Sequence, residues 1–193
     1  KKNNIKFLTS LFNPDDYSVI SGLKLDTIKI PSPENRNLKL LKICSKYFKN
    51  IYLSTGAAKV EEIKKSYKFL KKNNVTLMHC VSMYPCPDKN INLSRIQKLK
   101  KIHPKIKIGI SDHSPDTLST LFSLPLGVEL IEKHFTIDNN LPGRDNKFAI
   151  LPAALKSLRD KISRFEKMQK INEKLSKEEV EVRNVYSGRW IKP

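Results

Sequence analysis

Two histidines stand at the ends of apolar segments that have the composition of buried strands. His113 ends the segment Ser111-Asp112-His113, and His134 ends the segment Glu132-Lys133-His134. Because the carboxyl ends of parallel strands meet at one edge of a sheet, the two imidazoles could converge on one divalent transition metal ion. The alternative is a pair of hydrogen-bonded histidines beside the core, and the residues alone favour neither. His79 lies earlier on its own strand and is expected to pack inside.

Other strand ends supply groups that suit an anion. An ammonium and four hydroxyls come from successive strand ends: Lys29, Ser32, Ser54, Ser82 and Ser111. Gly56 allows close backbone approach where the next helix begins, a common seat for phosphate. Helix capping is the alternative role of the serines. Lys29 lies inside the apolar run Thr27–Ile30, where a lysine costs free energy unless it meets an anion or projects into a cleft. Five strands with polar ends favour an enzyme.

Six short apolar runs position these residues, and they are typical of strands buried on both faces of a parallel sheet. They are Ile5–Leu8, Thr27–Ile30, Ile51–Ser54, Val75–Cys80, Lys107–Ile110 and Gly127–Ile131. Helical spacing of apolar residues predicts helices over 36–49, 58–72, 93–102, 115–124 and 152–171. The inward face of the last helix is expected to carry Leu155, Leu158, Ile162, Phe165 and Met168. Asn13-Pro14 predicts one more helix start. Residues 172–193 are charged and expected to be irregular or peripheral.

Alternating strands and helices predict right-handed βαβ units around a parallel sheet, which is either open or closed into a barrel. No Gly-x-Gly-x-x-Gly follows the first run, so the sequence does not support a dinucleotide-binding open sheet. A barrel of eight units typically takes about 250 residues, whereas this chain has 193. We therefore expect an α/β fold of the TIM-type (β/α)8 class, of which the chain carries about six βα units with the first two missing.

The charge balance raises the question of a nucleic-acid partner. The chain has 37 Lys and Arg against 19 Asp and Glu, a formal net charge of +18. Residues 1–110 hold 23 of the basic and 7 of the acidic residues, mostly as Lys on the polar faces of predicted helices. Arg, which recognises base edges and binds phosphates through paired hydrogen bonds, is scarce. We therefore expect solvated helix faces and no nucleic-acid partner.

The remaining composition narrows the class of protein. Three cysteines without a Cys-x-x-Cys spacing form neither a disulfide framework nor a structural zinc site. No apolar run approaches the roughly 20 residues of a membrane helix. The sequence therefore favours a protein of the reducing cytoplasm that does not act with a membrane.

Six segments occur together at the strand ends and in the order found in one known family. They are Lys29-Ile30-Pro31-Ser32, Leu53-Ser54-Thr55-Gly56, His79-Cys80-Val81-Ser82-Met83-Tyr84-Pro85, Gly109-Ile110-Ser111-Asp112-His113, Glu132-Lys133-His134-Phe135-Thr136 and Leu141-Pro142-Gly143-Arg144-Asp145. With these segments, residues 5–149 resemble the sialic acid synthases. Those enzymes condense phosphoenolpyruvate with N-acetylmannosamine or a related N-acyl sugar to a nonulosonic acid and phosphate.

The resemblance implies a role for each of the residues that it covers. His113 and His134 would bind the divalent metal, normally Mn²⁺. The phosphoenolpyruvate would lie on Lys29, Ser32, Ser54, Ser82 and Ser111. Tyr84 and Asp145 would contact the sugar, and Lys29, Glu132 and Asp145 would be the catalytic residues. In the family's reaction the enol carbon attacks the sugar aldehyde, water adds to the resulting cation, and phosphate leaves with cleavage of its C–O bond.

The chain departs from the family in three ways. Its first two strands, which supply a catalytic Glu and a Lys, are expected to be missing, and so is the antifreeze-like domain. Many members have Pro-Asp-His where this chain has Arg144-Asp145-Asn146, which leaves the sugar open. We expect a partial synthase domain over 1–171, a tail over 172–193, a homodimer of the full-length protein and no complete reaction by this chain alone. The alternatives are another phosphoenolpyruvate-dependent ketosugar-acid synthase and an inactive or basic binding fragment.

Overall fold

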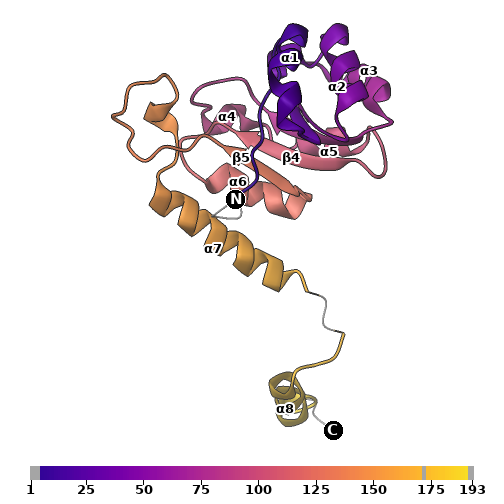
Figure 1. Ribbon diagram of the computed structural model, residues 1–193. Coiled ribbons are helices and arrows are strands. Elements are labelled where there is room, and N and C mark those ends of the chain that lie inside the picture. The colour runs from indigo at the N-terminus through magenta and orange to yellow at the C-terminus, as the bar shows by residue number, and fades with distance from the viewer. Residues whose placement is uncertain (1–4, 171–172, 191–193) are drawn as a thin grey trace. The chain divides into compact units, whose positions relative to one another are not determined.

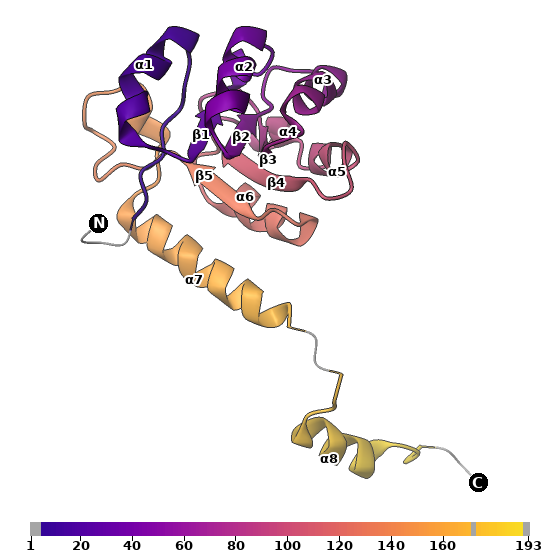
Figure 2. The ribbon, with the colours of Figure 1, turned by 45° about the vertical axis from the view of Figure 1, so that its right-hand side comes forward.

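A parallel sheet of five strands is the main feature of the computed structural model, which describes residues 5–170 and 173–190 (Figure 1). The strands are β1 (Thr27–Ile30), β2 (Asn50–Ser54), β3 (Asn74–Cys80), β4 (Lys107–Asp112) and β5 (Leu130–Lys133). They neighbour one another in chain order, as Figure 2 shows. Five of the six predicted strands are thus confirmed. The last begins later than expected because Gly127 ends a short helical turn at a φ of 81°.

The predicted strand Ile5–Leu8 is wrong. Residues 5–8 have no strand structure, and three of their apolar side chains lie in solvent. The segment that pairs with β1 comes directly after them. Its residue Leu11 is buried in the core, unlike the apolar residues of 5–8. There the Leu11 amide donates to the Lys29 carbonyl at 3.0 Å, and the Lys29 amide donates to the Thr9 carbonyl at 3.1 Å. Beyond β5, Phe135 and Ile150 form a corresponding parallel bridge.

The sheet is curled rather than flat. The Lys29 ammonium on β1 reaches the Glu132 carboxylate on β5 at 2.6 Å. Four strand spacings separate β1 from β5, which is about 19 Å in a flat sheet and more than the two side chains span. The contact therefore requires the strands to follow an arc. This curled parallel α/β arrangement agrees with the expected barrel class for the part of the chain that the structure describes.

Helices cover the convex face of this arc and bury its apolar side chains. They are α2 (Leu38–Tyr47), α3 (Val60–Leu70), α4 (Asp88–Ile91), α5 (Arg95–Lys100) and α6 (Leu118–Ser123), preceded by the short α1 (Tyr17–Ile20). Ile28 and Ile30 of β1 belong to the core cluster together with Leu41 of α2 and Ile63 of α3. Because side chains alternate along a strand, Lys29 between the two isoleucines projects to the opposite face. The strand pattern thus directs apolar groups to the helices and Lys29 to the interior of the arc.

Two of the predicted helix starts are confirmed by their caps, whereas the start predicted at 115 is wrong, because α6 begins only at Leu118. The Asn13 side chain accepts from the Asp15 amide at 3.2 Å, and Pro14 occupies the first position of the helical turn Pro14–Asp16. At α2 the Asn37 side chain accepts from the Leu40 amide at 3.2 Å. Both contacts satisfy an amide that would otherwise lack a partner at the helix end.

The chain divides into two compact units, residues 1–158 and 159–193. Helix α7 (Pro152–Met168) buries Leu158 and half-buries Ile162 and Phe165, so the expected inward face of the last helix is wrong for Leu155 and Met168. Leu155 and Met168 are 43% and 70% exposed. The predicted end of this helix, Ile171, lies outside the described residues.

For residues 172–193, the expectation of irregular structure is wrong over 177–186, and the alternative of a peripheral segment stays a prediction. Helix α8 (Lys177–Tyr186) begins at Ser176, whose hydroxyl accepts from the Glu179 amide at 3.1 Å while the Glu179 carboxylate accepts from the Ser176 amide at 2.8 Å. This reciprocal capping box is the local signal that the charge-rich composition concealed. None of the described helices is both long enough and apolar enough to cross a membrane.

Candidate active site

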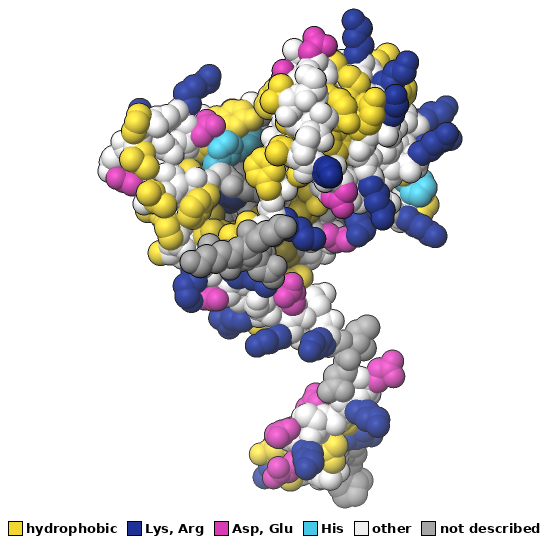
Figure 3. Space-filling model, in the orientation of Figure 1, with side chains coloured by type: hydrophobic (Ala, Val, Ile, Leu, Met, Phe, Trp, Pro, Cys, Tyr) yellow, Lys and Arg dark blue, Asp and Glu magenta, His cyan; other side chains and the backbone are white. Residues whose placement is uncertain are grey.

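A cavity of about 520 Å³ opens at the carboxyl ends of the strands. Figure 3 shows a hollow in the molecular surface with histidine side chains (cyan) beside it. Nine of the ten residues proposed for the site line this cavity: Lys29, Ser32, Ser54, Tyr84, Ser111, His113, Glu132, His134 and Asp145. Its size is that of a small-molecule site. The topology thus brings together side chains that are as far as 116 residues apart in the chain.

Lys29 and Glu132 form an ion pair inside the cavity. The Lys29 ammonium donates to both carboxylate oxygens at 2.6 Å, and the lysine side chain is only 15% exposed. The anion that the sequence requires for Lys29 is therefore supplied within the chain, by β5. This pair presents both a positive and a negative group to a bound molecule.

His113 and His134 lie side by side, with ring centroids 5.3 Å apart. The His113 Nδ1 lies 2.9 Å from the Val81 carbonyl, which fixes this nitrogen as the donor and leaves Nε2 with its lone pair. Burial lowers the pKa of His113, which keeps the ring neutral, although the bond to Val81 acts in the opposite direction. Tyr84 stacks beside His113 at 4.2 Å between centroids.

The two histidines are the nitrogen donors that a transition metal would find here. Among the described residues, no group of three or more His, Cys, Asp or Glu side chains is arranged to hold a metal ion. Neutral imidazoles suit Mn²⁺, Fe²⁺, Co²⁺ or Zn²⁺. A metal at this position would take its other ligands from water or substrate, which is the open form of a catalytic site.

Each of these histidines follows one member of a buried ion pair. The Lys133 ammonium donates to the Asp112 carboxylate at 2.9 Å, and the two side chains are 5% and 2% exposed. Hydroxyls of Ser119 and Thr120 on α6 donate to the same carboxylate at 2.7 and 2.6 Å. Burial alone would raise the pKa of Asp112, but these hydrogen bonds and the lysine lower it. Asp112 and Lys133 are register partners in the β4–β5 ladder, so the pair fixes the strands where the histidines begin.

The serines differ in how they meet the cavity. Ser54 is 1% exposed and its hydroxyl oxygen has no hydrogen-bond partner among the described residues, although Ser54 lines the cavity. Ser32 accepts from the Gly56 amide at 3.1 Å. Ser82 is exposed and does not line the cavity, but a Cβ on Gly56 would stand 2.4 Å from its hydroxyl oxygen. Gly56 therefore has no room for a side chain, whereas the phosphate seat expected there stays a prediction, and the next helix begins only at Val60.

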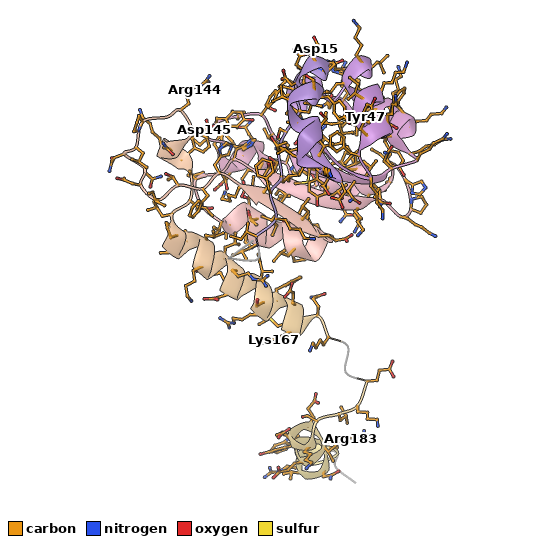
Figure 4. The ribbon with its side chains drawn as sticks, viewed as in Figure 1. Asp15, Tyr47, Arg144, Asp145, Lys167 and Arg183 are labelled. Carbon is orange, nitrogen blue, oxygen red and sulfur yellow. The ribbon has the colours of Figure 1, made fainter. Side chains whose placement is uncertain are left out.

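The loop between β5 and α7 adds the remaining polar groups, and Figure 4 labels Arg144 and Asp145 on it. The Asp145 carboxylate lies 3.5 Å from His134 Nδ1. Both Arg144 and Asp145 line the cavity and are exposed. Burial raises the pKa of Tyr84, and the charges of Asp145 and Glu132 act in the same direction. Tyr84 therefore keeps its proton and offers a hydroxyl.

Several residues around the site are not evident from the sequence. Asn35 and Arg95 contact the backbone after β2, and Asp112 and Lys133 form the buried pair. The signal for the last two is their position next to the histidines, whereas nothing in the local sequence marks Arg95. His79 is buried, as predicted, and its Nε2 donates to the Ile91 carbonyl at 2.8 Å.

Several named proteins are similar to this chain in sequence. A model of the NeuB family matches residues 1–174. An N,N'-diacetyllegionaminic acid synthase of Campylobacter jejuni is 40% identical over 172 residues, which cover 86% of this chain and 51% of that protein. The chain thus spans about half the length of this curated relative.

Solved structures share the fold. A sialic acid synthetase from Leptospira borgpetersenii, crystallised with citrate, superposes with a TM-score of 0.85 and 32% identity, over 96% of this chain and 67% of that chain. A phospho-2-dehydro-3-deoxyheptonate aldolase (DAHP synthase) of Thermotoga maritima has a TM-score of 0.72 at 18% identity, over 86% of this chain and 52% of that one, which is a likeness of fold alone. Since the family model matches most of the sequence and a solved relative repeats its fold, the chain belongs to the NeuB family.

Proposed function

We propose that this chain forms the phosphoenolpyruvate- and metal-binding part of a nonulosonic acid synthase site. The reaction joins the enol carbon of phosphoenolpyruvate to the aldehyde of an N-acyl sugar such as N-acetylmannosamine, with uptake of water and release of phosphate. The observation that carries the proposal is the convergence of Lys29, Ser54, His113 and His134 on one cavity in a NeuB-family chain. The printed names of two relatives, a legionaminic acid synthase and a sialic acid synthetase, support the class of product.

The anionic substrate is assigned to the side of the cavity formed by β1, β2 and β4. Lys29 supplies positive charge, and the hydroxyls of Ser32, Ser54 and Ser111 supply hydrogen bonds to phosphate or carboxylate oxygens. The buried Ser54 hydroxyl has the clearest need for a ligand, because a buried polar group without a partner costs free energy. Ser82 would act from the rim, through its position beside Gly56.

The metal is assigned to His113 and His134, with Mn²⁺ as the proposed ion. When bound, it would polarise the sugar aldehyde and stabilise the negative charge that develops on its oxygen. The two imidazoles fit this role because burial keeps His113 neutral and because His113 Nε2 is the nitrogen left with a lone pair. Asp112 and Lys133 hold the two strand ends in register behind them.

The other cavity residues would orient the sugar and move protons. Glu132 has two carboxylate oxygens on Lys29, so a phosphate that draws the ammonium away leaves Glu132 as a proton acceptor. Tyr84 and Asp145 line the cavity beside the histidines and can bind sugar hydroxyls. The names of the two relatives give different products, so the sugar used by this chain is left open by the comparison.

The test is binding of the two components to the purified chain. Calorimetry with phosphoenolpyruvate should give saturable binding that Ser54→Ala weakens by about tenfold, the loss expected for one hydrogen bond to a charged group. Electron paramagnetic resonance should show Mn²⁺ bound to the chain and not to a His113→Ala, His134→Ala double variant that still unfolds cooperatively. Wild-type chain that binds neither component, or a double variant with unchanged Mn²⁺ content, would refute the proposal.

A further inference from the structure

The loop after β2 has its carbonyl groups tied down by two side chains from elsewhere in the fold. Asn35 Nδ2 donates to the carbonyls of Ser54 at 3.2 Å and of Gly56 at 3.1 Å. Arg95, the first residue of α5, donates to the carbonyl of Thr55 at 2.9 Å and also to that of Ala58. The carbonyls of residues 54, 55 and 56 are thus held alternately by one side chain and the other, and that of Ala58 by Arg95, which leaves the loop little freedom.

This arrangement sets the direction of a peptide N–H. In a trans peptide the C=O and the following N–H point in opposite directions. Since the Thr55 carbonyl points at Arg95, the Gly56 N–H points away from Arg95, and it donates to the Ser32 hydroxyl at 3.1 Å. The Ser32 hydroxyl in turn donates to Cys80 Sγ at 3.4 Å, and both residues line the cavity, so a line of dipoles runs from the guanidinium to the cavity wall.

In the described chain the Arg95 guanidinium donates its hydrogen bonds to backbone carbonyl groups. Arg95 is half-buried and forms no ion pair with a carboxylate in the part of the chain that the structure describes. Its third contact is the Cys80 carbonyl, at the carboxyl end of β3, at 3.5 Å. Because no carboxylate neutralises this charge in the described chain, the guanidinium still attracts a nearby anion.

The loop also holds a backbone conformation that it would not adopt unaided. Ala57 has a φ of 52°, in the left-handed region that side chains with a Cβ disfavour. Gly56 beside it has no room for a side chain, because a Cβ would lie 2.7 Å from the Ser32 hydroxyl oxygen. Residues in such conformations persist where their surroundings determine them, and here Asn35 and Arg95 do so.

We propose that Arg95 and Asn35 are positioning residues for the anion site: they orient the loop 54–58 so that the Gly56 N–H polarises Ser32, and the Ser32 and Ser54 hydroxyls face a phosphate or carboxylate in the cavity. This inference rests on the proposed function for the identity of the anion. It adds that the affinity for the anion depends on an arginine in the outer helix layer that does not line the cavity.

The experiment compares Arg95→Gln, Arg95→Lys and Asn35→Ala with a matched control, Arg36→Gln. Arg36 is exposed and pairs with Glu62, so its loss removes the same charge without a contact to the loop. Binding of phosphoenolpyruvate and, separately, of inorganic phosphate is measured by calorimetry at a temperature where each variant is folded by circular dichroism. Amide exchange of Gly56 is followed by NMR in each ¹⁵N-labelled variant that folds.

We expect Arg95→Gln and Asn35→Ala to weaken both anions by about tenfold and to speed Gly56 exchange, with partial rescue in Arg95→Lys and no change in Arg36→Gln. Folded Arg95→Gln and Asn35→Ala variants that bind both anions like the wild type would overturn the inference, even if their melting temperatures fall. If Arg95→Gln does not fold, Asn35→Ala and Arg95→Lys decide in the same way.

The phosphate arm separates this inference from the proposed function. The wild-type chain could bind inorganic phosphate in a way that depends on Arg95, yet not bind phosphoenolpyruvate. That result would support the anion site and contradict the proposed function. If the chain binds phosphoenolpyruvate with an affinity that changes in neither the Arg95 nor the Asn35 variants, the result would support the proposed function and contradict this inference. A wild-type chain that binds neither anion would overturn the inference that Arg95 and Asn35 position an anion site.

Discussion

Lys29 depends on Glu132 for its place in the interior of the arc. If Lys29→Met removes the ammonium, the carboxylate of Glu132 loses both of its hydrogen bonds at 2.6 Å. We expect the variant to lose about 1.5–3 kcal/mol of unfolding free energy, the range for hydrogen bonds to charged groups. Urea denaturation measures this loss. Glu132→Gln, which keeps an acceptor for the lysine, serves as the milder comparison, and a Lys29→Met chain as stable as wild type would show that the pair contributes nothing.

Cys44 gives a second prediction at the scale of one residue. Its thiol is fully buried in the core cluster, and burial raises its pKa to about 12. At pH 8 only about one Cys44 in ten thousand is then a thiolate, the form that reacts. We expect an alkylating reagent at pH 8 to leave Cys44 unmodified in the native chain and to modify it in urea, as read by peptide mass spectrometry. Native labelling as fast as that of the unfolded chain would contradict the burial of this residue.

The carboxyl ends of β4 and β5 depend on the pair between Asp112 and Lys133. Breaking a buried pair by removing one partner typically costs about 3–5 kcal/mol, because the other charge stays buried. Asp112→Asn should therefore destabilise the chain by several kcal/mol in urea. The control is Glu129→Gln, which removes an exposed contact of 3.8 Å to Lys107 between the same two strand regions and should change stability by less than about 1 kcal/mol.

A second outcome at this pair distinguishes support of the strands from simple stability. If Asp112→Asn is folded yet Mn²⁺ binding falls, the pair also holds the spacing of His113 and His134. Equal stabilities of the Asp112→Asn and Glu129→Gln variants would contradict the buried position of Asp112, which is 2% exposed.

The elements were the part of the structure that the sequence predicted best, for a physical reason. A run such as Thr27–Ile30 carries its own signal, since apolar residues buried on a sheet must be contiguous or alternating. The run Ile5–Leu8 has the same pattern but does not form a strand, because its apolar side chains stay exposed in the described chain. The capping box at Ser176 is equally local, but the charge of the segment hid the helix that it starts.

The candidate site was predictable in its membership and not in its contacts. Strand-end position placed nine of ten residues on the cavity, and their roles stay predictions. The partner of Lys29 is 103 residues away, and only the curl of the sheet decides it. Arg95 was missed because its function is to bind carbonyl groups, which every residue has and no sequence pattern marks.

At the scale of the whole molecule, stability should fall as the solution becomes acidic below neutral pH. Burial lowers the pKa of His79 from 6.5, although the bond to the Ile91 carbonyl opposes this effect. The native chain keeps this ring neutral while the unfolded chain takes up a proton as the pH falls through about 6.5. The unfolded state then binds more protons, so the free energy of unfolding decreases as the pH falls, by at most about 1.4 kcal/mol per pH unit for one group.

Urea unfolding at a series of pH values from 7.5 to 5 would measure this slope. We expect a His79→Gln variant to show a shallower loss than wild type, with the slope that remains coming in part from His113, whose pKa is lowered in the same direction. At pH 7.5 both rings are almost entirely neutral in both states, so the difference between the two proteins there reports packing and the hydrogen bond to Ile91. Parallel curves for variant and wild type across the whole range would refute the assignment to His79.

The alternation at the ends of β4 and β5 has a consequence for how this part of the chain can vary. Asp112 and His113, like Lys133 and His134, are consecutive residues that serve opposite sides of one sheet. A single inserted or deleted residue upstream within either strand would exchange the two sides, with a carboxylate or an ammonium in the cavity and an imidazole among the helices. Substitutions here change one group at a time, whereas a change of length by one residue removes the candidate metal site and the buried pair together.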